Sequence, residues 1–160
     1  MKIAIAPDSF KESMTAKEVC GSVERDILSI FPNCEIIKIP MADGGEGTLE
    51  SLVDATDGNI YCENTLNPLG EEIISRYGIL NEKKTAVIEM ASSSGLELIP
   101  IEKRNPYITT TYGTGQLILK ALDHNIEKII LGIGGSATND GGSGMLQALG
   151  ARLLDEKGEK

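Results

Sequence analysis

The chain has 160 residues and a formal net charge of −9, with 24 acidic against 15 basic residues. Nucleic acids and anionic membranes repel such a charge, which argues against non-specific binding to either. Hydrophobic residues make up 41% of the sequence, which is enough to form a core. No apolar run approaches the ~20 residues of a membrane span, and a predicted strand takes the place of a signal peptide. We therefore expect a cytoplasmic protein.

The three cysteines, Cys20, Cys34 and Cys62, are odd in number and far apart in the sequence. They form no CxxC or Cys/His pattern, so the sequence predicts neither a zinc site nor a disulfide framework. We expect all three to be reduced and to fill space in the fold.

Residues 1–58 alternate between strand and helix signals. Thr15 and Glu18 fit a capping box, in which each side chain bonds to the backbone amide of the other residue. The predicted elements are a strand, a helix, a strand and a helix, over Ile3–Ala6, Thr15–Ile30, Glu35–Ile39 and Thr48–Thr56. Gly58 sits where the C-terminal cap of the last helix is expected. This βαβα order predicts a parallel, Rossmann- or flavodoxin-like sheet with crossover helices.

Residues 59–90 have a different pattern. Three strand-like segments are separated by short turns, over Asn59–Leu66, Glu72–Leu80 and Lys84–Met90. The turn at Asn67–Gly70 combines Asn, Pro and Gly, and this spacing predicts a small antiparallel meander. The chain as a whole is therefore expected to have an α/β fold.

Residues 91–160 return to helix and strand signals. The predicted elements are a helix, a buried strand, a glycine-rich loop, a short helix and a last strand, over Thr114–Asn125, Lys128–Ile133, Gly134–Gly144, the stretch up to Leu149, and Ala151–Leu154. We expect this αβ segment to be the start of a second domain.

Ligands of parallel α/β sheets bind where strands end and helices begin, and three loops have that position. The first, Asp8–Ser13, lies between the first strand and the first helix. Backbone amides at a helix start attract anions, and Lys11 adds a positive charge. Asp8 or Ser9 also fits an ordinary helix cap, so the loop is either an anion site or a plain turn.

The second loop, Ala42–Thr48, places Asp43 and Glu46 among three glycines. Two carboxylates repel phosphate, but they suit a loop that holds Mg²⁺ or accepts hydrogen bonds from substrate hydroxyls. Gly44 and Gly45 let the backbone approach a ligand closely. The alternative is a hairpin-type Asp-Gly turn without a ligand.

The third loop, Gly132–Gly144, has six glycines in thirteen residues after a buried strand. So much backbone freedom is costly to order, which argues against a plain connecting loop. Hydroxyl, amide and carboxylate groups lie together in it, at Ser136, Thr138, Asn139 and Asp140. The loop is therefore the strongest candidate for contact with a polar ligand.

Part of this loop, Gly132–Ala137, also matches the dinucleotide fingerprint G-x-G-x-x-[GA], with Asp155 near the expected place of a ribose-binding acid. The fingerprint needs a helix that begins inside the motif. Because Gly141 and Gly142 follow, a continuous helix from that point is not expected. A nicotinamide site is therefore an alternative with poor sequence context.

Three further positions have two interpretations each. Thr109–Gly115 leads into a helix, where Thr114 either caps the helix or offers a hydroxyl to a ligand. Glu89 is either a ligand-facing carboxylate or an edge residue at a strand end. His124, the single histidine, lies near a helix C-terminus, where a partial positive charge is favourable, so histidine-based catalysis is not expected.

Four segments together carry a family resemblance, namely Ala6–Lys11, Ala42–Thr48, Thr111–Gly115 and Gly132–Gly142. In residues, order and spacing they resemble the bacterial glycerate kinase family, type 1, and the resemblance covers essentially the whole chain. It implies ATP-dependent phosphorylation of D-glycerate to a phosphoglycerate, in a two-domain α/β fold with one domain inserted into the other. Family members are much longer, so the chain resembles their N-terminal portion. We expect this portion to be inactive alone and to self-associate.

The resemblance gives the loops roles in phosphoryl transfer, which needs positioned phosphates, Mg²⁺ and a carboxylate at the attacking hydroxyl. The implied catalytic residues are Asp43, Asp140 and Lys11, and the two acids are also the implied Mg²⁺ ligands. The implied substrate contacts are Asp8, Ser9, Gly44, Gly45, Glu46 and Arg104, with Lys11 or Arg104 as counter-charge to the glycerate carboxylate. The implied phosphate or nucleotide contacts are Thr114, Gly134, Gly135, Ser136, Thr138, Asn139, Gly141 and Gly142.

Several alternatives stay open at the level of sequence. The pattern does not separate the acid that acts as base from the acid that holds Mg²⁺, nor phosphorylation of the 2-hydroxyl from that of the 3-hydroxyl. A nicotinamide-dependent oxidoreductase and a non-catalytic module that binds a small acid are the two rival functions.

Overall fold

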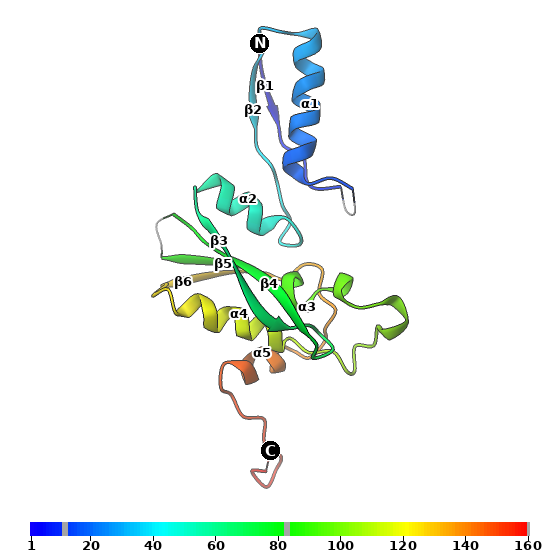
Figure 1. Cartoon of the computed structure of the whole chain (residues 1–160), viewed down its shortest axis with the longest axis vertical. Coiled ribbons are helices and arrows are strands. Elements are labelled where there is room, and N and C mark those ends of the chain that lie inside the picture. The colour runs from blue at the N-terminus through cyan, green and yellow to red at the C-terminus, as the bar shows by residue number, and fades with distance from the viewer. Residues whose placement is uncertain (11–12, 82–83, 160) are drawn as a thin grey trace.

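The computed structural model describes residues 1–10, 13–81 and 84–159 (Figure 1). The strands are β1 (Lys2–Ile5), β2 (Glu35–Lys38), β3 (Asn59–Leu66), β4 (Glu72–Ile79), β5 (Thr85–Glu89) and β6 (Lys128–Gly132). The helices are α1 (Ala16–Ile30), α2 (Thr48–Ala55), α3 (Ala91–Ser94), α4 (Tyr112–Leu122) and α5 (Ser143–Ala148), with short 3₁₀ turns at Leu96–Leu98 and Ile101–Lys103. Within the described ranges, no helix combines the length and apolar character that a membrane crossing needs.

The N-terminal unit consists of β1, α1 and β2. The two strands pair in parallel, with Lys2 opposite Glu35, and α1 connects them as a crossover helix. The predicted capping box is present, because the Thr15 hydroxyl accepts the Glu18 N–H at 3.2 Å and the Glu18 carboxylate accepts the Thr15 N–H at 2.8 Å. The predicted strand–helix–strand unit is confirmed, and it lies at one end of the molecule in Figure 1.

A four-stranded sheet of order β3-β4-β5-β6 forms the body of the molecule. β3, β4 and β5 pair antiparallel, which confirms the predicted meander, and β6 adds to β5 in parallel. The Asn67 side chain closes the β3–β4 turn by accepting N–H groups from Leu69 and Glu71 at 2.9 Å each. β6 thus belongs to the same sheet as the meander. The start of a second domain after residue 90 stays a prediction.

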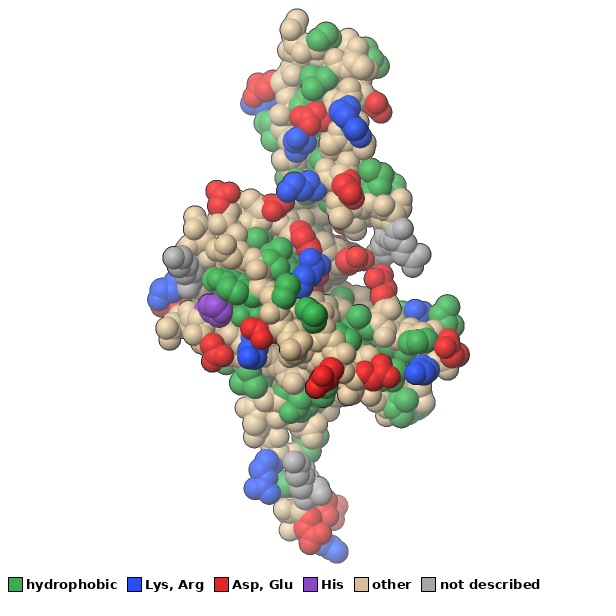
Figure 2. All heavy atoms as spheres, in the orientation of Figure 1, with side chains coloured by type: hydrophobic (Ala, Val, Ile, Leu, Met, Phe, Trp, Pro, Cys, Tyr) green, Lys and Arg blue, Asp and Glu red, His purple; other side chains and the backbone are tan. Residues whose placement is uncertain are grey.

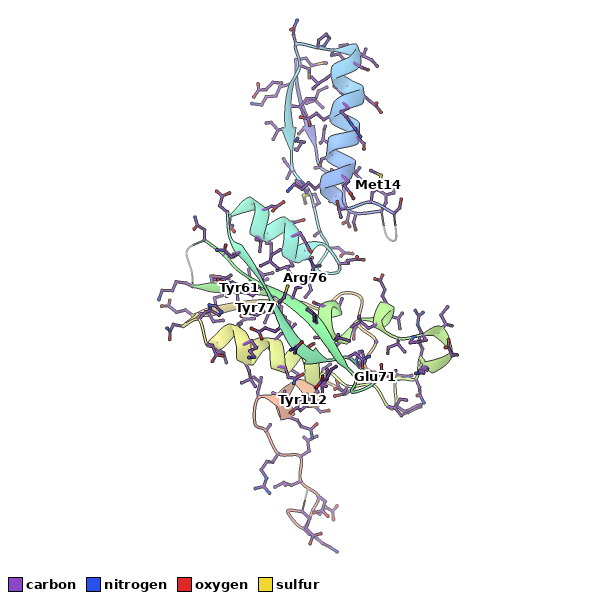
Figure 3. All side chains as sticks on the ribbon, in the orientation of Figure 1. Met14, Tyr61, Glu71, Arg76, Tyr77 and Tyr112 are labelled. Carbon is purple, nitrogen blue, oxygen red and sulfur yellow. The ribbon has the colours of Figure 1, made fainter. Side chains whose placement is uncertain are left out.

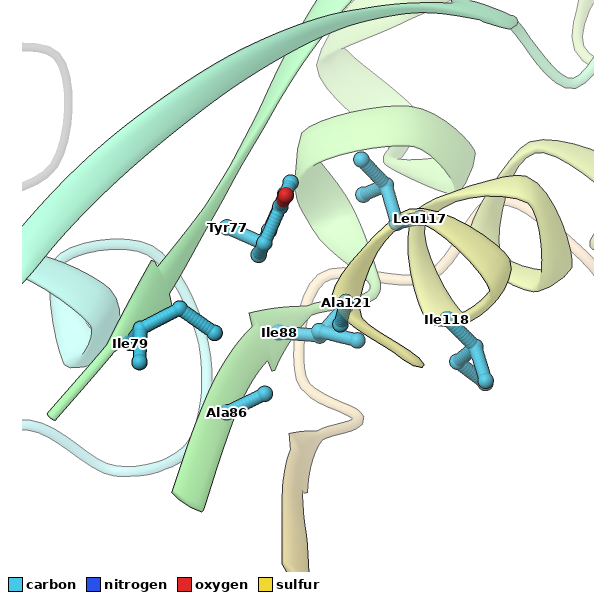
Figure 4. Close-up of a cluster of buried hydrophobic side chains, with 7 residues drawn as sticks. All are labelled: Tyr77, Ile79, Ala86, Ile88, Leu117, Ile118 and Ala121. Carbon is cyan, nitrogen blue, oxygen red and sulfur yellow. The ribbon is translucent and has the colours of Figure 1, made fainter. Parts of the chain in front are cut away.

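The core lies on both faces of this sheet. On one face, α4 packs over a cluster that includes the fully buried Tyr77 and is completed by Ile79, Ala86, Ile88, Leu117, Ile118 and Ala121 (Figure 4). On the other face α2 packs so closely that a Cβ on Gly78 would lie 2.5 Å from the Val53 side chain. Burial of these apolar side chains is the main stabilising contribution to the body.

The predicted last strand, Ala151–Leu154, is wrong. The segment has irregular backbone, and Leu153 and Leu154 are each 48% exposed. A strand is stable only when its amides and carbonyls pair with a neighbour, and the described chain offers none beside this segment. Alternating apolar residues therefore predicted an element that has no partner here.

Two predicted helix ends are also corrected. After α2 the left-handed residue is Asp57, at φ +51°, and Gly58 instead donates its N–H to Val53 O at 2.9 Å. Gly58 is still required, because a Cβ there would lie 2.6 Å from Ile79 O. α4 begins at Tyr112, earlier than the predicted Thr114, and the left-handed Asn125 lies beyond its end.

Candidate active site

The second and third glycine-rich loops touch each other through their backbones. Gly134 donates its N–H to Gly44 O at 3.0 Å. A Cβ on Gly132 would lie 2.5 Å from Gly44 O, and one on Gly134 would lie 2.7 Å from the Gly45 Cα. We call this contact of Gly44–Gly45 with Gly132–Gly134 the glycine junction. Its glycines are needed for backbone packing as well as for the approach of any ligand.

Asp43 lies exposed beside the glycine junction. Its Oδ1 accepts the Gly45 N–H at 2.9 Å, which fixes the side chain over the loop. Its Oδ2 has no hydrogen-bond partner among the described residues. This oxygen can therefore accept a proton or contact a cation, as the sequence predicted for Asp43.

The N-terminus of α2 is occupied by a side chain of the protein. Glu89, only 5% exposed at the end of β5, accepts the Leu49 N–H at 2.7 Å. Burial raises the pKa of Glu89 above its ordinary value, although the hydrogen bonds from the α2 backbone oppose that shift. Glu89 is thus neither exposed to a ligand nor on an edge strand. Its carboxylate occupies the N-terminus of α2, a position that can otherwise attract an anion.

We expect the free energy of unfolding to depend on the protonation of Glu89. Its pKa is higher in the folded than in the unfolded chain, so this contribution is complete below the ordinary glutamate range and is lost as the pH rises through the folded value. Glu89→Gln keeps an acceptor for the Leu49 N–H without a buried charge. The variant should lose this pH dependence in urea unfolding measured from pH 4 to 8.

Glu89→Leu is the control for the hydrogen bond. It leaves the Leu49 N–H without an acceptor and should be less stable than Glu89→Gln by about 1–3 kcal/mol at every pH. An identical pH dependence in wild type and Glu89→Gln would contradict the assignment.

Both carboxylate oxygens of Asp140 accept hydrogen bonds from the protein itself. Its Oδ2 accepts the N–H and hydroxyl of Thr111 at 2.9 and 2.8 Å and the Gly144 N–H at 3.1 Å, while Oδ1 accepts the Gly142 N–H at 3.0 Å. Burial alone would raise the pKa of Asp140, but these hydrogen bonds outweigh it and hold the pKa below the ordinary value. A carboxylate so engaged is a poor base and a poor Mg²⁺ ligand. Asp140 instead ties the third loop to the start of α4.

Asp140→Ala should therefore reduce stability. Removing the acceptor of four hydrogen bonds is expected to cost about 1–3 kcal/mol in the free energy of unfolding. Because the folded pKa of Asp140 is lowered, its contribution is present above the ordinary aspartate range and is lost as the pH falls through the folded value. Urea unfolding at neutral and acidic pH measures both effects. If Asp140→Ala kept the stability of the wild type but the whole protein lost activity, Asp140 would have a catalytic role.

The remaining predicted phosphate contacts divide into engaged and exposed groups. Ser136 and Thr138 bond to each other through their hydroxyls at 2.9 Å. Thr114 is only 1% exposed, and its hydroxyl bonds to those of Ser93 and Ser94, so it lies within the packing of α3 against α4. The positions that face solvent are Gly135, Asn139 and Gly141.

The backbone after β6 does not fit the nicotinamide alternative. Gly141 and Gly142 are both left-handed, at φ +62° and +79°, and α5 begins only at Ser143. The helix therefore does not start inside the Gly132–Ala137 fingerprint, and its N-terminus is not placed for a pyrophosphate.

A cleft of about 570 Å³ lies between the N-terminal unit and the body. It is lined by the start of α1, by residues 9–10 and 13–15 before it, by the connection after β2, by α2 and by Arg76 of β4. Figure 2 shows acidic and basic side chains gathered where the two parts meet. Ser9 and Glu46 line the cleft, while the exposed Asp8 accepts the Ser9 N–H at 2.7 Å. The structure thus brings the first two predicted loops to one cleft.

Two predicted cations are not among the described residues of this cleft. Lys11 lies outside the described residues. Arg104 follows the second 3₁₀ turn, donates to Ile99 O at 3.2 Å, and does not line the cleft. The described cations there are Lys17 and Arg76, and neither was predicted to be a site residue. Arg76 could have been found from the alternation of β4, which places it on the α2 face.

Comparisons with known proteins identify the family of the chain. The model of the glycerate kinase family matches residues 3–160. The chain belongs to the glycerate kinase family. It is 58% identical over 160 residues to a glycerate kinase of Bacillus subtilis (strain 168) and 54% identical over 160 residues to a glycerate 2-kinase of Escherichia coli (strain K12), covering all of this chain and 42% of each relative.

A solved structure shows the same fold for a protein of this family. The crystal structure of a Salmonella typhimurium LT2 protein described as glycerate kinase 2 is 52% identical and superposes with a TM-score of 0.86. The match covers all of this chain and 43% of that one. The chain therefore spans less than half the length of the glycerate kinases that it matches, and its parallel and mixed sheets belong to a fold that it shares with this solved structure.

Proposed function

We propose that the whole protein that contains this chain phosphorylates D-glycerate with ATP. The observation that carries the proposal is the glycine junction, where the Gly45 N–H holds Asp43 in the same loop as Glu46, which lines the cleft, in a chain that belongs to the glycerate kinase family. Relatives that are 54–60% identical over this region are named glycerate kinase or glycerate 2-kinase. A cleft of this size, with apolar and charged side chains in its lining, accommodates a small hydroxy acid.

In the proposed reaction a glycerate hydroxyl oxygen bonds to the γ-phosphorus of ATP. The bond from that phosphorus to the β–γ bridging oxygen breaks, ADP leaves, and the hydroxyl proton passes to Oδ2 of Asp43. The Gly45 N–H holds Oδ1 of Asp43 at 2.9 Å, so the second oxygen is presented in one orientation. Such a fixed base is typically worth 10²- to 10⁴-fold in rate.

The acids of the second loop fit a Mg²⁺ ion that enters with ATP. Mg²⁺ in kinases is bound by substrate phosphates and one or two carboxylates. Asp140 does not fit, because its oxygens already accept protein hydrogen bonds. Glu46 is exposed at the cleft and has no hydrogen-bond partner among the described residues, so it would hold the ion and leave Asp43 for the proton. Mg²⁺ would there neutralise phosphate charge.

The test is ADP release by the whole protein with Mg-ATP and D-glycerate, with D-lactate, which lacks the 3-hydroxyl, and glycerol as comparison substrates. We further propose the 2-hydroxyl as acceptor, since the Escherichia coli relative is named a glycerate 2-kinase. The position of the phosphate can be read with enolase, which acts on 2-phosphoglycerate directly. A product that enolase accepts only after phosphoglycerate mutase is added would contradict the 2-hydroxyl as acceptor. Absence of turnover with D-glycerate would contradict the function itself. The 160-residue chain alone is expected to give no turnover, and this stays a prediction.

A further inference from the structure

The α2 face of β4 is covered over only part of its length. Gly78 lies directly under α2, close to the Leu49 and Val53 side chains. Arg76 and Ile74 follow on the same face at the two-residue period of a strand, and Ile74 is 72% exposed. Arg76 therefore stands at the edge of α2, where the covered part of the sheet ends and the cleft begins (Figure 3).

Both described cations of the cleft are paired with acids of α2. Arg76 Nη2 lies 2.7 Å from the Glu50 carboxylate, and the two side chains are 49% and 38% exposed. Lys17 lies 2.6 Å from Asp54, one helical turn after Glu50. Pairs this exposed contribute little to stability, so an incoming anion can replace Glu50 at the guanidinium at small cost.

The chemistry of the two cations selects Arg76 for a carboxylate. A guanidinium presents parallel N–H donors that match both oxygens of a carboxylate, whereas an ammonium such as that of Lys17 acts as a point charge. Arg76 is also anchored through its backbone, because its N–H donates to the Ser92 hydroxyl at 2.8 Å. This backbone anchor favours recognition of one ligand group in a fixed place.

The charge of the cleft favours a small monoanion over a polyphosphate. The described lining has two cations against four carboxylates, those of Glu18, Glu46, Glu50 and Asp54. A nucleotide triphosphate without its metal would be repelled by this excess of negative charge. A single carboxylate that exchanges with Glu50 leaves the charge at Arg76 balanced.

We propose that Arg76 binds the carboxylate of the acid substrate, and that Glu50 is the counter-ion that this carboxylate displaces. The inference rests on the proposed function. It makes Arg76 the residue by which that site prefers acids to neutral polyols. Met14 and Thr15, just before α1, line the cleft together with Arg76, so the bound acid would lie between the N-terminal unit and β4 (Figure 3).

The test uses steady-state kinetics of the whole protein with D-glycerate and ATP varied separately. Arg76→Gln should raise the KM for D-glycerate by about 10- to 100-fold, because a hydrogen bond to a charged group is lost, with the KM for ATP unchanged. Arg76→Lys should give a smaller rise, since the paired donors are lost and the charge is kept. Glu50→Gln should lower the KM for D-glycerate by about 2- to 5-fold, because the competing carboxylate is gone.

Arg25→Gln is the matched control, since Arg25 is an exposed arginine on α1 that does not line this cleft. Its KM values should equal those of wild type. Thermal unfolding of each variant identifies loss of fold, and Glu50→Gln tests the exchange even if Arg76→Gln unfolds. The inference would be overturned if Arg76→Gln left the KM for D-glycerate unchanged, or if it raised only the KM for ATP. Turnover of D-glycerate by the wild type would still support the proposed function in that case. Absence of wild-type turnover would instead reject the function.

Discussion

Asp43→Asn is expected to lower kcat for D-glycerate phosphorylation by about 10²- to 10⁴-fold without loss of fold. The Asn side chain keeps an oxygen that accepts the Gly45 N–H, so the loop geometry of the wild type is retained. What it loses is the second carboxylate oxygen, Oδ2, which has no partner among the described residues. Stopped-time ADP assays at saturating D-glycerate and Mg-ATP measure the effect, and thermal unfolding checks the fold.

Two further variants separate the roles of the acids. Glu46→Gln should raise the Mg²⁺ concentration needed for half-maximal rate and leave the saturated kcat closer to wild type. Asp26→Asn, an exposed change on α1, should have no effect on either quantity. If high Mg²⁺ restores the rate of Asp43→Asn, then Asp43 holds the metal and its assignment as base is wrong.

Local signals predicted most of the secondary structure. The capping box at Thr15 and Glu18 and the Asn67–Gly70 turn are each complete within a few residues, so no tertiary contact was needed to predict them. The strand at Ala151–Leu154 failed for the opposite reason. Its pattern is local, but a strand exists only with a paired neighbour, and the described chain supplies none.

The candidate site was predicted in its parts but not in its contacts. Composition and position singled out the loops at Asp43 and Gly132–Gly144, yet nothing in the sequence showed that Gly134 bonds to Gly44. An acid among glycines suits catalysis and backbone anchoring equally well. For Asp140 the deciding partner is Thr111, which lies far away in the sequence, and only the fold shows that both carboxylate oxygens already accept hydrogen bonds.

Glu89 and Arg76 show the same limit for residues on strands. Glu89 accepts a hydrogen bond from the Leu49 amide of α2, a helix that comes before the β3–β5 meander in the sequence. Arg76 is one charged residue in a strand, and its relation to the cleft depends on where α2 stops covering the sheet. Both roles depend on packing between elements, which the periodicity of a single segment does not specify.

Gly134→Ala is expected to reduce turnover by at least about 100-fold. The added Cβ would lie 2.7 Å from the Gly45 Cα and 2.8 Å from the Gly45 nitrogen. Both are backbone atoms, so no flexible side chain can move aside, and the glycine junction must open. The Gly45 N–H that orients Asp43 moves with it, and misplacement by about 1 Å can cost ~100-fold in rate.

Two alanine variants separate this contact from other effects of losing a glycine. Gly141→Ala has nothing within 4 Å of the added Cβ but needs a left-handed backbone at φ +62°, so it should cost about 1–2 kcal/mol of stability and less activity than Gly134→Ala. Gly21→Ala, in the interior of α1 with nothing within 4 Å of the added Cβ, should be neutral or stabilising by about 0.5–1 kcal/mol. Wild-type turnover in Gly134→Ala would show that the two loops work independently. It would then remove the glycine junction as the device that positions Asp43.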